Sequence, residues 1–185
     1  MRRLVTIAGP IGAGKSTVAE LLGLRLATAG AATSLADLDE IAFAQRAQVD
    51  LSEFWRRAGV VHSVLVRSWF EAGADVVIAH GPFFESRSYD LLAAAAPEDA
   101  LQHHVLLRVP FEIALRRVAI DPGRGPSALS KDREFLRATH ERFQEVEQSL
   151  PRVDIEIDTS EMSASDVAER LLTLLQGDPP GILAG

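Results

Sequence analysis

The chain contains no cysteine among its 185 residues. It therefore has no disulfide framework, no thiolate metal site and no cysteine nucleophile. Long apolar runs are also missing, because charged residues interrupt each run well before it could cross a bilayer. The opening stretch MRRLVTIAGP contains no cleavable hydrophobic segment. These absences predict a cytoplasmic protein that does not associate with a membrane.

Lysine is scarce, and the charge balance is acidic. The chain carries 26 acidic and 19 basic residues, a net charge of −7, and only Lys15 and Lys131 are lysines. Broad nucleic-acid binding needs a basic face that displaces counterions from phosphates. We therefore expect no stable nucleic-acid partner. The other basic residues are arginines, whose planar guanidinium groups suit phosphate oxygens.

The order of apolar segments predicts the fold class. Five runs of strand length, rich in Val, Ile and Leu, alternate with segments of helical periodicity; the runs are Arg3–Ala8, Thr33–Asp37, Asp75–His80, His104–Val109 and Val153–Asp158. This alternation is typical of an α/β protein with a five-stranded parallel sheet and helices on both faces. The length fits one domain, which we place at residues 1–177, followed by a flexible tail at 178–185.

Helix signals stand between the runs. A helix is expected from Ser52 to Ala72, another starting at Pro110, and a last one from Ser163 to Gly177, with Asp166 completing a capping box. In the first of these, residues at helical spacing form an apolar face that we expect in the core: Phe54, Ala58, Val61, Leu65 and Trp69.

Residues 9–17, GPIGAGKST, match the phosphate-loop pattern G-x-x-x-x-G-K-[ST] between a predicted strand and a predicted helix. Glycines let the backbone N–H groups turn around a phosphate, Lys15 can reach the β- and γ-phosphates, and the Ser16 hydroxyl can bind Mg²⁺. The pattern predicts a nucleoside triphosphate with Mg²⁺: ATP, with GTP as the alternative. The expected contacts are Gly9, Gly12, Ala13, Gly14, Lys15, Ser16 and Thr17.

Two carboxylates follow the second predicted strand. Ligands of open parallel sheets bind beyond the carboxyl ends of the strands, so Asp37 and Asp39 are expected to face the γ-phosphate side of the nucleotide. One carboxylate can accept a proton from a substrate hydroxyl, and its neighbour can hold Mg²⁺ through water. For Asp39, a helix N-cap is an equally good interpretation. A guanine-specific N-K-x-D run is missing after any late strand, which argues against a regulatory GTPase.

The stretch DPGRGPSALSKD, residues 121–132, lies between two helical patterns and contains two glycines and two prolines. A loop of this length and composition is often a functional flap. We therefore predict a lid at about residues 120–132.

Together these features resemble the small kinases of the nucleoside-monophosphate-kinase fold. The resemblance rests on GPIGAGKST, on Asp37 and Asp39, on HGP at 80–82, on the arginine-bearing flap, and on DTS at 158–160. Shikimate kinase, gluconate kinase and chloramphenicol 3-O-phosphotransferase belong to this group. The resemblance implies a three-layer P-loop kinase fold with a mobile lid, and ATP-dependent transfer of the γ-phosphoryl group to a hydroxyl.

The resemblance also implies roles for single residues. It makes Asp37 and Asp39 the residues that bind the acceptor hydroxyl and act as base or metal partner, and leaves open which of the two is the base. Because His80 stands where members often have an acidic residue, the metal role passes to Ser16 and Asp37. The resemblance assigns phosphoryl clamping to Arg117 and Arg124, with Arg116 as the alternative register for the first. It places Asp158, Thr159 and Ser160 around the adenine.

The segment from about 40 to 72 should build the acceptor site with the exit of the third strand. The expected acceptor contacts are Asp37, Asp39, Phe43, Arg57, His80, Gly81 and Pro82; His62 and His103 receive no role. The apolar bulk of GPFF at 81–84 disfavours shikimate and favours a larger, partly hydrophobic, hydroxylated acceptor. The leading hypothesis is an antibiotic, as for chloramphenicol phosphotransferase and the kinases that inactivate nucleoside antibiotics such as capuramycin. Nucleosides, nucleotides and sugar acids are the alternatives.

Two other classes stay open. One is a nucleotide-binding module without turnover, although such a module needs no acceptor base. The other is a kinase of a macromolecule such as an RNA end, or of a sugar-nucleotide in the manner of zeta toxins. A monomer and a homodimer are both compatible with the sequence.

Overall fold

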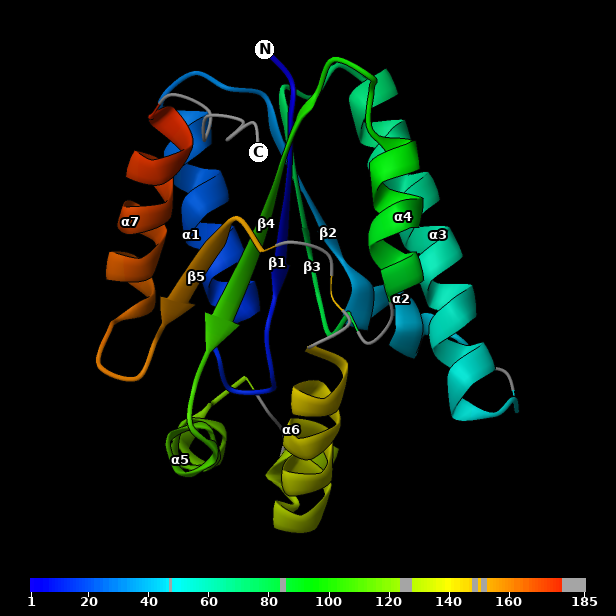
Figure 1. Cartoon of the computed structure of the whole chain (residues 1–185), viewed down its shortest axis with the longest axis vertical. Helices are drawn as coiled ribbons and strands as arrows, with labels where there is room; N and C mark the ends of the chain where they lie inside the picture. Colours follow the sequence, from blue (N-terminus) through cyan, green and yellow to red (C-terminus); the bar gives the residue numbers. More distant parts are fainter. Residues whose placement is uncertain (47, 84–85, 124–127, 148–149, 151–152, 178–185) are drawn as a thin grey trace, which may run out of the picture.

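A computed structural model describes residues 1–46, 48–83, 86–123, 128–147, 150 and 153–177. Five strands form one parallel sheet in the order β2-β3-β1-β4-β5 (Figure 1). The strands are β1 (Arg3–Ala8), β2 (Thr33–Asp37), β3 (Val76–His80), β4 (Leu101–Arg108) and β5 (Ile155–Asp158). The helices are α1 (Lys15–Thr28), α2 (Leu38–Ala44), α3 (Leu51–Glu71), α4 (Ser86–Ala95), α5 (Phe111–Ile120), η1 (Leu129–Lys131), α6 (Arg133–Glu147) and α7 (Ala164–Gln176).

Both faces of the sheet are covered, which explains why its strands are almost continuously apolar. In β1, Val5 and Ile7 pack with α1 and α7 in one core cluster, while Leu4 and Ala8 pack with α3 and α4 in a second. Figure 1 shows α1 and α7 on one side of the sheet and α3 and α4 on the other. The predicted five-stranded parallel α/β fold is confirmed.

Several strand bounds differ from the predicted ones. β3 begins at Val76 and β5 at Ile155, one and two residues later than expected. β4 begins three residues early, at Leu101, and ends at Arg108. The first residues of β4, Leu101 to His103, do not show an apolar strand pattern, because Gln102 is exposed and the buried residue His103 is polar. A polar buried residue breaks the apolar pattern without breaking the ladder.

The helix expected at Ser52–Ala72 is present as α3, but its buried face is rotated from the expected one. Ala58 is buried as predicted, whereas Val61 is 55% exposed and Trp69 is 38% exposed. The residues that face the core are Ala58, Gly59, His62, Ser63, Val66 and Phe70. Small and polar residues fill this face, so hydrophobicity alone indicates the wrong stripe.

Helix ends agree with capping chemistry. Ser163 and Asp166 form the predicted capping box of α7, which ends at Gly177. Pro110 is the N-cap of α5 rather than its first residue. Asp37, not Asp39, caps α2: its Oδ1 accepts from the N–H of Asp39 at 2.7 Å and of Glu40 at 3.4 Å.

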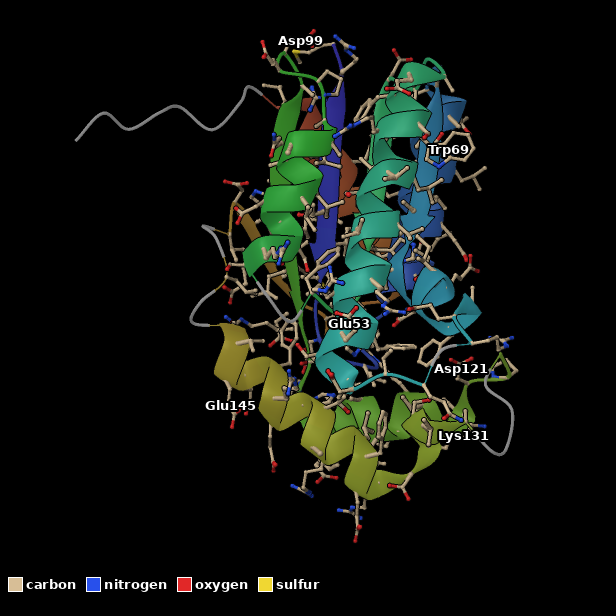
Figure 2. All side chains as sticks on the ribbon, turned by 90° about the vertical axis from the view of Figure 1, so that its right-hand side faces the viewer. Glu53, Trp69, Asp99, Asp121, Lys131 and Glu145 are labelled. Carbon is tan, nitrogen blue, oxygen red and sulfur yellow. The ribbon has the colours of Figure 1, made fainter. Side chains whose placement is uncertain are left out.

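α5 and α6 lie beyond the carboxyl ends of the strands (Figure 1). Asp121 and Lys131, labelled in Figure 2, belong to the described parts of the predicted lid, which exclude residues 124–127. Arg124 and the tail at 178–185 fall outside the described residues, so their predicted roles are not addressed by the structure. Among the helices in the described part of the chain, none is long and apolar enough to cross a membrane.

Candidate functional site

The ends of β1, β2 and β3 bring the predicted site residues together. In the parallel register Asp37 is paired with His80, and His80 with Ile7. The N–H of Gly81 donates to the carbonyl of Ile7 at 3.3 Å. The phosphate loop, which follows β1 directly, and Asp37 are thus separated by a single strand.

The loop from Gly9 to Gly14 packs so tightly that glycine is required at two positions. A Cβ on Gly9 would lie 2.5 Å from the carbonyl oxygen of Leu107 in β4. A Cβ on Gly12 would lie 2.8 Å from the Cβ of Ala114 in α5, and Gly12 has φ +83°. The loop is therefore fixed between β4 and α5, immediately before the N-terminus of α1.

Lys15 begins α1 and is 8% exposed. Its Nζ donates to the carbonyl of Pro10 at 3.1 Å, which folds the side chain back over the loop. Ser16 and Thr17 are exposed in the same first turn. The start of the helix thus offers a lysine ammonium, backbone N–H groups and two hydroxyls to an anion.

Arg117 of α5 connects the phosphate loop to the residues after β5. Its guanidinium donates to the carbonyl of Gly12 at 3.3 Å, to the Thr159 hydroxyl at 2.9 Å, and to the carbonyls of Thr159 and Ser160. The Thr159 hydroxyl lies 3.3 Å from the carbonyl of Ala13 and is buried. In this structure Arg117 thus binds the loop from outside, while Arg116 is exposed.

Asp158 and Ser160 form a small turn at the end of β5. Asp158 Oδ1 accepts from the backbone N–H of Ser160 at 2.8 Å and from its hydroxyl. These hydrogen bonds hold the pKa of Asp158 below its usual value. The turn lies next to Thr159, and so beside the phosphate loop.

Asp37 and His80 form a polar centre on the side where the acceptor is predicted to bind. His80 Nδ1 lies 3.7 Å from Asp37 Oδ2, beyond hydrogen-bond distance, and has no hydrogen-bond partner among the described residues. Burial lowers the pKa of His80 to about 4, against the opposing charge of Asp37. A neutral imidazole with an unpaired buried nitrogen faces the carboxylate.

His62, to which the sequence analysis assigned no role, supports this centre. Its Nε2 lies 2.9 Å from the carbonyl of Ala36, the residue before Asp37. Its ring stacks on Phe83 with the centroids 6.0 Å apart. A buried histidine of α3 therefore holds the end of edge strand β2.

The other predicted acceptor residues lie on α2, α3 and the exit of β3. Phe43, 59% exposed, packs against Phe54 and Trp55 with ring centroids 6.1 and 6.3 Å apart. Asp39 lies half-buried in the first turn of α2. Arg57 pairs with Glu53 at 2.6 Å, on the part of α3 that Figure 2 shows nearest to α5 and α6.

A cavity of about 20 Å³ lies among α2, α3 and α4. Leu38 and Pro82, which follow Asp37 and Gly81 directly, line it together with Trp55 and Gly59. Arg56 and Arg87 supply its charged wall. The space beside the polar centre is thus mainly apolar, with guanidinium groups at its border.

No protein-family model and no curated protein sequence matches the chain. Solved structures match nearly all of it. Shikimate kinase from Acinetobacter baumannii, in complex with shikimate, is 22% identical over 95% of this chain and 93% of its own, with a TM-score of 0.52. The tunicamycin resistance protein of Deinococcus radiodurans is 16% identical over 97% and 100%, with a TM-score of 0.58.

The APS kinase of Mycobacterium tuberculosis is 13% identical over 95% of this chain and 98% of its own, with a TM-score of 0.59. At these identities the similarity establishes the fold. The chain has the P-loop kinase fold, in agreement with its strand order and its glycine loop.

Proposed function

We propose that this protein is an ATP- and Mg²⁺-dependent phosphotransferase that moves the γ-phosphoryl group to a hydroxyl of a small molecule. One observation carries the proposal: Asp37 is the last residue of β2, and only β3 separates β2 from β1, which leads into the phosphate loop. The Oδ2 of Asp37 lies 3.7 Å from Nδ1 of His80, the last residue of β3. A protein that only binds nucleotide needs the loop but no carboxylate at this place.

The residues present fit a nucleotide with its metal. The phosphate loop packs against β4 and α5 and has no room for side chains at Gly9 and Gly12, and the Lys15 side chain folds back over it. Ser16 and Asp37 would hold Mg²⁺, whose charge neutralises the phosphates when it is bound. Asp158, Thr159 and Ser160 would border the adenine, and Arg117 would join that turn to the phosphates.

The two oxygens of Asp37 have different tasks. Oδ1 is used as the cap of α2, because it accepts from the N–H of Asp39 at 2.7 Å. Oδ2 is the oxygen nearest His80 and is available to the acceptor hydroxyl. We assign proton acceptance to Oδ2 late in the transfer, since phosphoryl transfer depends mainly on positioning and charge neutralisation.

The acceptor is proposed to be a hydroxylated natural product with an apolar part, such as an antibiotic. The rings of Phe43, Phe54 and Trp55 and the walls of the cavity at Leu38 and Pro82 support this class. The cavity takes only a small substituent, so most of the acceptor would lie outside it, toward exposed Phe43. The fold neighbour described as a tunicamycin resistance protein is consistent with this class.

Mass spectrometry tests the function directly. The purified protein is incubated with Mg-ATP and a library of hydroxylated antibiotics, nucleosides and sugar acids. We expect one compound to gain a single phosphoryl group with wild type and none with Lys15→Ala, whose fold is checked by circular dichroism. Full transfer by Lys15→Ala would refute the role of the loop. ATP binding without transfer to any compound would favour a binding module or a macromolecular acceptor.

A further inference from the structure

His140 of α6 contacts the phosphate loop from a helix that carries no recognised motif. It is 5% exposed, and its Nε2 lies 2.8 Å from the carbonyl oxygen of Ile11. Because a carbonyl can only accept, Nε2 must carry the proton. The ring stands edge-on to Phe111 of α5, with centroids 5.7 Å apart at 82°. Burial lowers the pKa of His140, so the imidazole stays neutral at pH 7.

This contact fixes the direction of a peptide group. In a planar trans peptide the C=O and the following N–H point in opposite directions. With the Ile11 carbonyl held toward His140, the N–H of Gly12 must point away from α6. Neither this N–H nor that of Gly14 finds an acceptor within the described residues. Both donors are free to meet an anion.

Arg117 holds the following carbonyl in the same manner, because it donates to the carbonyl of Gly12 at 3.3 Å. The Thr159 hydroxyl lies 3.3 Å from the carbonyl of Ala13 and 3.0 Å from that of Arg108, so its single proton is better placed for Arg108. Two consecutive carbonyls, those of Ile11 and Gly12, are thus held from α6 and α5.

We propose that His140 is a positioning residue for nucleotide phosphate: by holding the Ile11 carbonyl outward, it presents the Gly12 N–H to the phosphate group. This inference rests on the proposed nucleotide-binding function. It also makes α6, the helix after the predicted lid, part of the phosphate site. Arg137, whose guanidinium lies 4.3 Å from the centre of the Phe111 ring, fastens α6 to α5 beside this contact.

Three variants test the role of His140. His140→Leu removes the donor. His140→Gln retains one, because the glutamine Nε2 is as many bonds from Cα as the histidine Nε2. His103→Leu is the matched control: His103 is also 5% exposed, its Nε2 has no partner in the described part of the chain, and it is paired with Val5 in the middle of β1, four residues before the loop begins. The measurements are calorimetric titrations with Mg-ADP and with inorganic tripolyphosphate, and thermal melting without ligand.

We expect His140→Leu to weaken both ligands by about tenfold, as for one lost hydrogen bond that positions a donor, and the other two variants to stay within about threefold of wild type. His140→Leu should melt at a lower temperature than His103→Leu, because only the former leaves a carbonyl without its partner. The titrations are therefore made well below the melting temperature of each variant, so that a loss of affinity reports positioning and not unfolding. Unchanged Mg-ADP affinity in His140→Leu, or an equal loss in His140→Gln, would overturn the inference alone. Failure of wild type to bind either ligand would overturn the proposed function as well.

Discussion

Single residues in this protein serve two purposes at once, and Asp37 is the clearest case. Its Oδ1 closes the first turn of α2, while its Oδ2 faces His80. The sequence predicted a functional carboxylate here from its position after a strand. It did not indicate that the same side chain is also the helix cap, because the pattern pointed to Asp39 as the candidate cap.

The two purposes can be separated by substitution. Asn is as good an N-cap as Asp, so Asp37→Asn should keep stability while lowering the phosphoryl-transfer rate by roughly 10²- to 10⁴-fold. Asp37→Ala should lose that rate and also about 1 kcal/mol of unfolding free energy. Urea unfolding and single-turnover kinetics measure the two effects. A collapse of nucleotide affinity in Asp37→Asn, with the rate kept at saturation, would make Asp37 chiefly a metal partner.

The contacts of His140 and Arg117 illustrate what residue patterns leave out. The phosphate loop could be predicted because its chemistry is contiguous in sequence. The groups that orient its carbonyls stand 129 and 105 residues away; the resemblance implied another role for Arg117, and no pattern indicated His140. Only the packing of α5 and α6 against the loop brings them there.

At the scale of elements, α3 is the helix of the predicted acceptor segment whose buried face differs from the expected one. Hydrophobic periodicity predicted its length to within one residue at each end but not its buried face, because His62 and Ser63 replace apolar residues on that face. His62 is buried because it satisfies the carbonyl of Ala36 in edge strand β2. A polar contact, rather than an apolar one, sets the rotation of the helix at this point.

Removing this contact should weaken the attachment of β2. His62→Leu leaves the carbonyl of Ala36 without its partner, and we expect a loss of about 1 to 3 kcal/mol of unfolding free energy. Val61→Ala changes the adjacent, 55% exposed position and should stay within about 0.5 kcal/mol of wild type. Urea unfolding compares the two. Equal stability of both variants would show that the His62 contact contributes nothing to holding β2.

For the whole molecule, the predicted α/β fold holds because alternation of strand and helix patterns is a property of many residues and tolerates local errors. A different global property escapes such patterns: each of the five histidines is largely shielded from water. Burial lowers the pKa of all of them, namely His62, His80, His103, His104 and His140. The folded protein therefore binds fewer protons than the unfolded chain in weak acid.

Stability should accordingly depend on pH in a defined window. The unfolded histidines gain protons as the pH falls through about 6.5 and the folded ones only at lower pH, so unfolding becomes easier below about pH 6.5. His80, whose folded pKa is about 4, should alone contribute about 1.4 kcal/mol of loss between pH 7.5 and 5.5, and the other four histidines should add to the loss. Urea unfolding at these two pH values checks the loss. A constant unfolding free energy would mean that the histidines titrate in the folded protein as they do in the unfolded chain.

The direct join of β2 to α2 has a consequence for engineering. Asp37 is both the last residue of the strand and the cap of the helix, so no connecting residue lies between the proposed base and the helix. An insertion at this join would move the carboxylate away from His80 and uncap α2 in one step. Between α2 and α3, Gln45 donates to the carbonyl of Phe54 and Asp50 caps α3. On the proposed function, residues added or removed there would alter these local contacts and the fit of the acceptor without moving Asp37.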